Sequence, residues 1–204
     1  MIKRLSLVCL FFAASAFAQD FDIEVTVLDD YEAASRLANA GKHQEALAVF
    51  EECVAEGNVR CYFGLGTYYY FGDGGIEQDY DKAFELIRSG AEGDYGPAEY
   101  LMARMLFDGQ GAEADPDTAL TYLERAAYKC IAYAQEELAQ QYLSAGSDDG
   151  IRDAAVWLQL ASANGSDNAA MAYNELFAAA PELFNEEVAM RKRAIEADIA
   201  CQEF

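Results

Sequence analysis

Few residues in this chain have the types and spacing that catalysis or metal binding requires. The sequence contains one histidine, His43, and five cysteines without a Cys-x-x-Cys pair. A lone imidazole is interpreted as a surface residue, and scattered thiols do not make a zinc site. No nucleophile, metalloprotease or phosphate-binding motif is present. The acidic segment 146–150 lacks calcium-loop spacing and is interpreted as a solvated turn. The sequence therefore predicts no catalytic residue, no metal site and no cofactor.

Aromatic side chains are the other candidates for a functional surface. Residues 68–75 read YYYFGDGG, so three tyrosines and a phenylalanine precede a cluster of glycines. Such rings can contact a ligand or pack in a core. Which of the two applies depends on the elements that position them.

Those elements come from a repeat of 37 residues, the interval from Gly72 to Gly109 and from Gly109 to Gly146. Each glycine is expected to end a helix, because glycine enters the left-handed region cheaply. Upstream of each, small and large residues recur four positions apart and so share one helical face. They are Cys61, Leu65 and Tyr69, then Ala98, Met102 and Leu106, then Ala134, Leu138 and Tyr142.

A second helix is predicted after each glycine, over residues 79–93, 115–129 and 151–165. Asp79 and Asp115 are expected N-caps, and Pro116 occupies a first-turn position that tolerates proline. Small residues at fixed positions let neighbouring units approach closely. The sequence thus predicts an all-α fold, a right-handed α-solenoid of stacked helical hairpins.

The first 30 residues are assigned separately. Residues 1–18 carry Lys3 and Arg4, then an apolar run and a small-x-small site ending at Ala18. This pattern predicts a secretory signal peptide and not a membrane anchor. Residues 19–30 are predicted to form an N-terminal arm. The repeat domain is expected over 31–204, with units of about 31–57, 58–93, 94–130 and 131–167 and a C-terminal cap over 168–204 whose helix begins at Pro181.

The charge of the chain argues against one class of partner. Asp and Glu number 36 against 14 Lys and Arg, which gives a formal net charge of −22 at pH 7. Such a chain is repelled by phosphate backbones and anionic lipid surfaces. We therefore expect no binding to nucleic acid. Together with the predicted signal peptide, the sequence predicts a periplasmic or secreted protein that does not insert stably into a membrane.

The repeat resembles a known family, the Sel1-like repeat, which is related to the tetratricopeptide repeat. The matching residues are Ala98, Met102, Ala103, Gly109, Gln110, Gly111, Asp115, Ala119, Tyr122, Leu123, Ala126 and Ala127. The similarity is strong over 57–165 and weaker at both flanks. The first loop has an extra residue, and the third lacks the Gly-x-Gly pattern. The resemblance implies a protein–protein interaction scaffold without catalytic machinery.

The resemblance also bears on the cysteines. Four remain after the signal segment, and four cysteines allow three pairings. In the repeat register, Cys53 and Cys61 replace two alanines that touch across the turn between units, which is similar to a secreted cysteine-rich branch of the family. A Cys53–Cys61 disulfide is therefore implied in an oxidising compartment. Cys130–Cys201 would be the remaining pair, and two free buried thiols are the alternative for the first.

The same register assigns the aromatic residues. Tyr69 takes a core position, whereas Tyr70 lies on an offset stripe that continues into the next unit. In solenoids of this type the first helices line the concave face, where partners bind. The predicted partner-binding residues are Phe63, Tyr70, Tyr100, Arg104 and Phe107. Aromatic and arginine side chains dominate interface hot spots. The alternative is that neighbouring units bury this stripe.

The predicted function is an exported helical-repeat scaffold that binds a protein or an extended peptide through its concave face. One alternative is an exported hydrolase or a cell-wall- or β-lactam-active protein of the cysteine-rich branch, which the missing motifs disfavour. Another is an acidic inhibitor of a basic partner, whose binding would weaken as salt rises.

Overall fold

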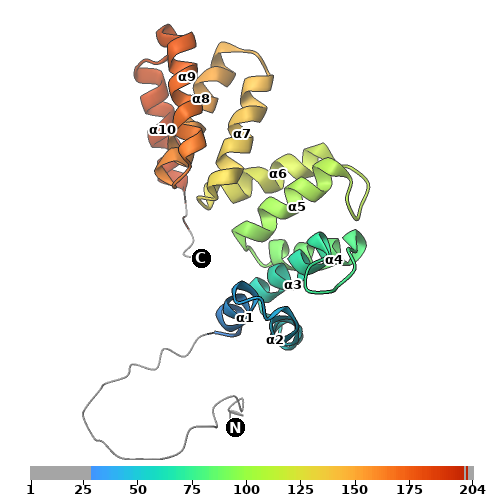
Figure 1. The fold of residues 1–204 in the computed structure, drawn as a ribbon. Helices are drawn as coiled ribbons and strands as arrows, with labels where there is room; N and C mark the ends of the chain where they lie inside the picture. Colours follow the sequence, from blue (N-terminus) through green and yellow to red (C-terminus); the bar gives the residue numbers. More distant parts are fainter. Residues whose placement is uncertain (1–28, 200, 202–204) are drawn as a thin grey trace, which may run out of the picture.

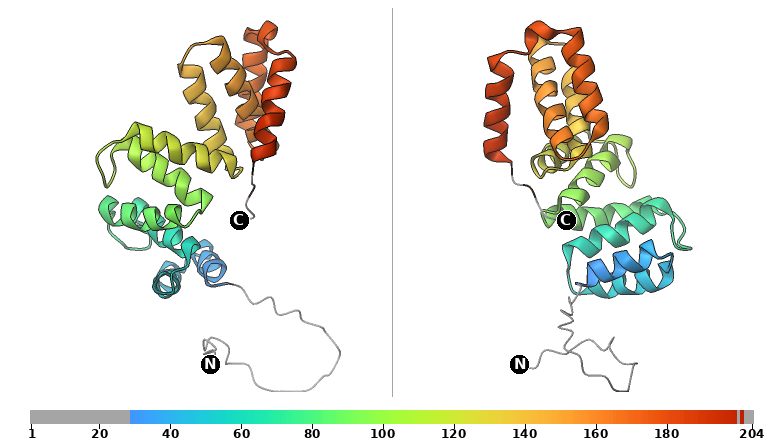
Figure 2. Two further views of the ribbon diagram at one scale, coloured as in Figure 1. Left: turned by 180° about the vertical axis from the view of Figure 1, so that it is seen from behind. Right: turned by 60° about the vertical axis from the view of Figure 1, so that its left-hand side comes forward.

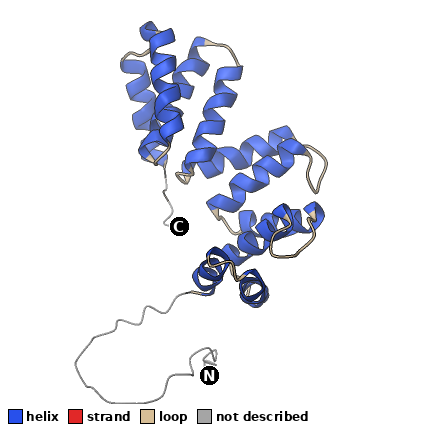
Figure 3. Ribbon diagram, viewed as in Figure 1, coloured by secondary structure: helices blue, strands red, loops and turns tan. Residues whose placement is uncertain are grey.

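The computed structural model describes residues 29–199 and 201. The predicted signal peptide and nearly all of the predicted arm lie outside this range. Within it the secondary structure is entirely helical, with no strand (Figure 3). The prediction of an all-α solenoid of helical hairpins is confirmed.

The described helices are α1 (Asp30–Asn39), α2 (His43–Ala55), α3 (Val59–Phe71), α4 (Tyr80–Glu92), α5 (Gly96–Asp108), α6 (Pro116–Tyr128), α7 (Ala132–Ser144), α8 (Asp148–Ala163), α9 (Asp167–Ala179), the short 3-10 helix η1 (Pro181–Leu183) and α10 (Glu186–Asp198).

Successive helices pair as hairpins. The most extensive contacts join α1 with α2, α3 with α4, α5 with α6, and α7 with α8. Each second helix also packs on the first helix of the next hairpin. The hairpins therefore form a curved stack that runs from α1 at one end to α9 and α10 at the other (Figures 1 and 2).

Small side chains permit this close stacking. Ala83, Ala119 and Ala154 are fully buried at matching positions of α4, α6 and α8. A Cβ atom placed on Gly90 of α4 would lie 2.9 Å from the Cβ of Ala98 on α5, closer than real Cβ atoms come. Glycine at this position therefore allows the two hairpins to touch.

The helix ends follow the predicted signals in the first two loops. Asp79 accepts a hydrogen bond from the Lys82 N–H at 2.9 Å, and Asp115 accepts one from the Thr118 N–H at 3.1 Å. Both are N-caps, as predicted. Gly72, the C-cap of α3, has φ of 73° in the left-handed region that favours glycine.

The third loop departs from the expected solvated turn. Ser147 is the N-cap of α8. The first turn of this helix begins at Asp148, so residues 148–150 are helical. Acidic side chains stabilise a helix N-terminus. Asp149 also lies 2.7 Å from Arg191 of α10. These interactions explain why α8 begins before the position that the repeat predicts.

The C-terminal cap also differs from its prediction. Pro181 begins only the short η1, and Asn185 then caps α10 by accepting from the Glu187 N–H at 2.9 Å. Helix α10 packs against α8, where Val188 is buried and Arg191 lies 2.6 Å from Asp153. A single helix from Pro181 was the wrong expectation, because the chain needs a turn to place α10 on α8.

One fully buried carboxylate links the two helices of the α5–α6 hairpin. The Oε1 of Glu99 on α5 lies 2.5 Å from Arg125 Nη2, and its Oε2 lies 2.7 Å from Lys129 Nζ. The same lysine contacts Asp94, in the turn before α5, at 2.5 Å. Burial raises the pKa of Glu99, and Lys129 and Arg125 oppose this shift. The hydrogen bond from Lys129 lowers the pKa of Asp94.

In the next hairpin, an uncharged hydrogen-bonded pair occupies the positions equivalent to Glu99 and Lys129. Gln135 on α7, also fully buried, donates to the Ala127 carbonyl and accepts from Asn164 Nδ2, both at 2.9 Å. Asn164 is the C-cap of α8, as Lys129 is the C-cap of α6. An ion pair in one hairpin thus corresponds to an amide pair in the next.

Candidate functional site

The five predicted partner-binding residues lie on two neighbouring first helices. Phe63 and Tyr70 belong to α3, and Tyr100, Arg104 and Phe107 belong to α5. Arg104 is exposed, and the four rings are half-buried. The stripe is therefore neither fully buried nor fully free.

Packing accounts for part of the α3 residues. The ring of Phe63 meets the buried Tyr95 edge-on at 5.6 Å between centroids. Tyr70 makes similar edge contacts with Tyr80 of α4 at 5.5 Å and with Phe71 at 4.8 Å. These contacts fix the orientation of both rings and leave part of each surface accessible.

The α5 residues extend the stripe toward α7. The ring of Tyr100 stacks on Tyr133 of α7, with centroids 6.4 Å apart and planes 25° apart. Burial and then the charge of Glu137 raise the pKa of Tyr100, and Arg104 opposes the shift. Burial likewise raises the pKa of Tyr70 against the charge of Arg104. The charge of Arg104 thus acts to lower the pKa of tyrosines on both α3 and α5.

Two exposed rings of this surface escaped the sequence pattern. Tyr133 is 68% exposed and Phe71 is 61% exposed, although each contacts a predicted residue. Tyr133 occupies the repeat position of Pro97, and Phe71 that of Asp108, so no aromatic residue recurs there. Only the spatial contact identifies them. We define the aromatic row as Phe63, Tyr70, Phe71, Tyr100, Arg104, Phe107 and Tyr133.

The tyrosine assigned to the core differs from the prediction. Tyr68 is the buried member of the run, and its hydroxyl lies 3.0 Å from His43 Nδ1. Tyr69 is half-buried, with Lys82 Nζ 4.0 Å from its ring centroid. His43 is accordingly half-buried and not a simple surface residue. The contact ties α2 to α3 as part of the hairpin packing.

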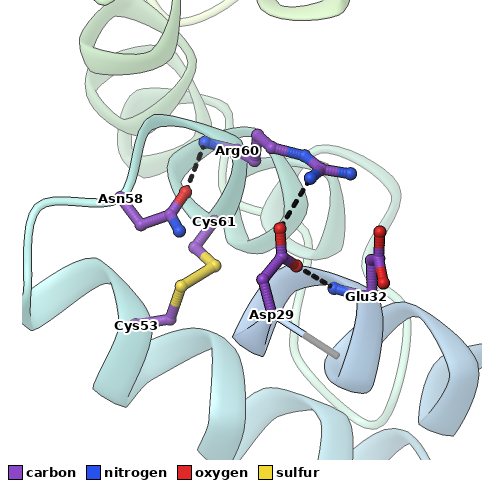
Figure 4. Close-up of a disulfide and its surroundings, with 6 residues drawn as sticks. All are labelled: Asp29, Glu32, Cys53, Asn58, Arg60 and Cys61. Carbon is purple, nitrogen blue, oxygen red and sulfur yellow. Dashed lines mark hydrogen bonds and ion pairs between the residues drawn. A yellow bond between two sulfur atoms is a disulfide. The ribbon is translucent and has the colours of Figure 1, made fainter. Parts of the chain in front are cut away.

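Both cysteine pairs stand at disulfide distance. Cys53 at the end of α2 and Cys61 at the start of α3 are bonded, with 5.9 Å between their Cα atoms (Figure 4). Beside them Arg60 Nη1 lies 2.7 Å from Asp29, the N-cap of α1. This arrangement joins the first hairpin to the second at their shared end.

The second pair joins the chain end to the middle of the solenoid. Cys130 and Cys201 are bonded, with 5.0 Å between their Cα atoms. Cys130 occupies the turn between α6 and α7 and has φ of 65°, a left-handed conformation that disfavours residues with a Cβ. The bond therefore connects the segment after α10 to a turn with restricted geometry.

The fold and the repeating side chains lead to one family. The Sel1 repeat model matches residues 59–95, 96–129 and 132–166, which together make up more than half of the chain. This protein belongs to the Sel1 repeat family. Each matched segment contains one first helix, its glycine or serine loop and one second helix. Sel1 repeats are protein-interaction modules and generally non-catalytic scaffolds.

One solved structure shows the same fold at low sequence identity, and a second is more distantly similar. A Sel1 repeat protein from Oxalobacter formigenes is 20% identical, with a TM-score of 0.66, over 74% of this chain and 59% of that one. The protective antigen c5321 of uropathogenic Escherichia coli strains, which displays an SLR fold, is 16% identical with a TM-score of 0.48, over 81% of this chain and 44% of the antigen. The chain thus spans less than two thirds of either. Comparison with curated proteins gives no match.

Two other kinds of functional feature, a metal site and a membrane-spanning helix, are absent from the described residues. No group of three His, Cys, Asp or Glu side chains among them is placed to hold a metal ion. Within the same range, no helix has the length and apolar character needed to cross a bilayer. The aromatic row is therefore the candidate site that the sequence and the geometry share.

Proposed function

We propose that this Sel1 repeat protein is an exported scaffold that captures another protein, or an extended peptide, on the aromatic row. The carrying observation is that Arg104 and Tyr133 are exposed side by side with rings that neighbouring helices hold in place, as in the stacking of Tyr100 on Tyr133. Aromatic rings and arginine contribute most to binding when a partner covers them, because they bury large area at little entropic cost.

The aromatic row has the rigidity that such a surface needs. The edge contacts of Tyr70 and the stacking of Tyr100 on Tyr133 restrict these rings before any partner arrives. Pre-ordered side chains lose less entropy on association. The row also spans α3, α5 and α7, so one extended partner could contact three successive hairpins.

Export is supported by two separate observations. The pattern over residues 1–18 is that of a signal peptide. The four remaining cysteines pair at disulfide distance, and disulfides persist in oxidising compartments. We infer that the protein acts in the periplasm or outside the cell.

The test is capture of partners by crosslinking in the exported fraction, followed by mass spectrometry and rebinding of the purified partner. Arg104→Ala with Tyr133→Ala removes two exposed groups of the row. A matched control, Arg88→Ala with Leu120→Ala, removes exposed groups from α4 and α6. Loss of rebinding in the first variant only, with both variants equally stable to heat, supports the proposal. Unchanged rebinding by the row variant would refute it.

A further inference from the structure

A groove lies between α7 and α9, next along the solenoid from the aromatic row. Its volume is about 420 Å³. Its lining is Glu136, Ala139, Gln140, Leu143, Leu158, Asn168, Ala169, Ala172, Glu175, Leu176 and Ala179. Glu136, Gln140 and Leu143 occupy the repeat positions of Tyr100, Arg104 and Phe107. The groove therefore continues the same helical face into the next hairpin.

The floor of the groove is apolar and its rim is acidic. Ala139, Leu158 and Ala169 are buried at its base. Glu136 belongs to the α7 side and Glu175 is exposed on the α9 side. Helices α7 and α9 contain four carboxylates, and neither contains a lysine or an arginine. Two of these carboxylates, Glu136 and Glu175, line the groove, and neither helix carries a cation beside them.

One carboxylate oxygen in the groove lacks a partner. The Oε1 atom of Glu136 is shielded from solvent and receives no hydrogen bond within the described residues. A buried acceptor without a donor is costly, and a donor that reaches it stabilises the pair. A lysine or arginine at the rim would pair with the half-buried Glu136 carboxylate and would also lie near Glu175 on the α9 side.

We propose that the groove between α7 and α9 binds a basic amphipathic segment of the partner protein. An apolar side chain of that segment occupies the floor, and an adjoining lysine or arginine pairs with Glu136 and Glu175. The charge of the chain favours such a segment over a second copy of this protein, because two chains of net charge −22 repel each other. The inference rests on the proposed function and specifies the chemistry of the partner.

The test uses a random dodecapeptide library displayed on phage and selected against the full chain. Enriched sequences should place lysine or arginine beside a leucine, isoleucine or methionine. Their affinity, measured by fluorescence anisotropy on the synthetic peptide, should fall about tenfold in Glu136→Gln with Glu175→Gln. It should also fall as salt rises from about 50 to 500 mM, because exposed charges are screened.

A matched control separates the groove from the overall charge. Glu51→Gln with Glu52→Gln removes the same number of negative charges, both exposed on α2, and should change the affinity by less than about twofold. Equal losses in both variants, or enrichment of peptides without basic residues, would overturn the inference. Peptides that depend on Arg104 and Tyr133 but not on the groove glutamates would overturn it while leaving the proposed function intact. If no peptide is selected at all, the inference fails, and the partner rebinding assay then decides the proposed function on its own.

Discussion

Exchanging the Glu99–Lys129 ion pair for the amide pair of the next hairpin tests how the two helices of one hairpin are joined. Gln135 and Asn164 occupy the equivalent positions, so the exchange is Glu99→Gln with Lys129→Asn. The double variant should form the same contact without charge. Each single variant should instead remove one ion-pair partner from the buried charged group that remains, Lys129 in one variant and Glu99 in the other.

The structure sets the size of the expected effects. Removing one member of a buried ion pair costs about 3–5 kcal/mol when the remaining charge has no other partner. Here Lys129 keeps Asp94 after Glu99→Gln, and Glu99 keeps Arg125 after Lys129→Asn. We therefore expect each single variant to lose about 2 kcal/mol and the double variant to lose about 1 kcal/mol, a coupling of about 3 kcal/mol.

Urea denaturation followed by circular dichroism measures these differences, and thermal melting should show a decrease of about 4–8 °C for each single variant. Glu113→Gln, an exposed carboxylate in the loop before α6, serves as the control and should stay within about 0.5 kcal/mol of the parent. If the double variant instead loses as much free energy of unfolding as the two single variants added together, the amide pair cannot replace the ion pair in the α5–α6 hairpin. That result would refute the proposed equivalence.

Three further predictions concern stability. Breaking the Cys130–Cys201 bond, which spans 71 residues, should cost about 4 kcal/mol by denaturation, against about 2.5 kcal/mol for Cys53–Cys61, which spans 8; equal costs would contradict the loop-entropy argument. Asp94→Asn should reduce the acid sensitivity of folding. Because Lys129 lowers the pKa of Asp94 below 3.8, the stabilisation from its ionised form is present above that pH and disappears as the pH falls further, so the parent and the variant should converge in stability between about pH 6 and pH 2; a constant difference would contradict this. Gly111→Ala should destabilise more than Gly146→Ala. Both glycines have positive φ, which costs alanine about 1 kcal/mol, but a Cβ on Gly111 would meet the Tyr80 carbonyl oxygen at 2.3 Å whereas Gly146 faces open space; similar melting temperatures would argue against that contact.

Local signals predicted the helices well where each residue acts on its own backbone. Asp79 and Asp115 cap their helices because a short acidic side chain reaches the N–H three residues ahead. Gly72 ends α3 because of its backbone freedom. The start of α8 was missed because Asp149 pairs with Arg191, which is distant in sequence. The helix expected from Pro181 was misjudged for a similar reason, since α10 is positioned by its contacts with α8.

The candidate site was predictable only in part. The repeat predicted that Tyr70, Tyr100 and Arg104 lie on one surface, because equivalent positions of stacked hairpins lie next to one another. It gave no indication of Tyr133, which stacks on Tyr100 from a position that is proline in the preceding unit. The buried Glu99 and Gln135 were also missed. A hydrophobic pattern assigns polar residues to the surface, so it gives no sign that these two side chains are buried.

The sequence by itself determined the hairpin repeat, the small residues that let hairpins touch and the acidic character of the protein. These properties depend on spacing along the chain and on composition, which are read directly from the residues. Only the tertiary structure decided which tyrosine is buried, which rings remain exposed and where an acidic-rimmed groove opens between α7 and α9. Exposure depends on what neighbouring hairpins cover, and that is fixed by packing between residues far apart in the chain.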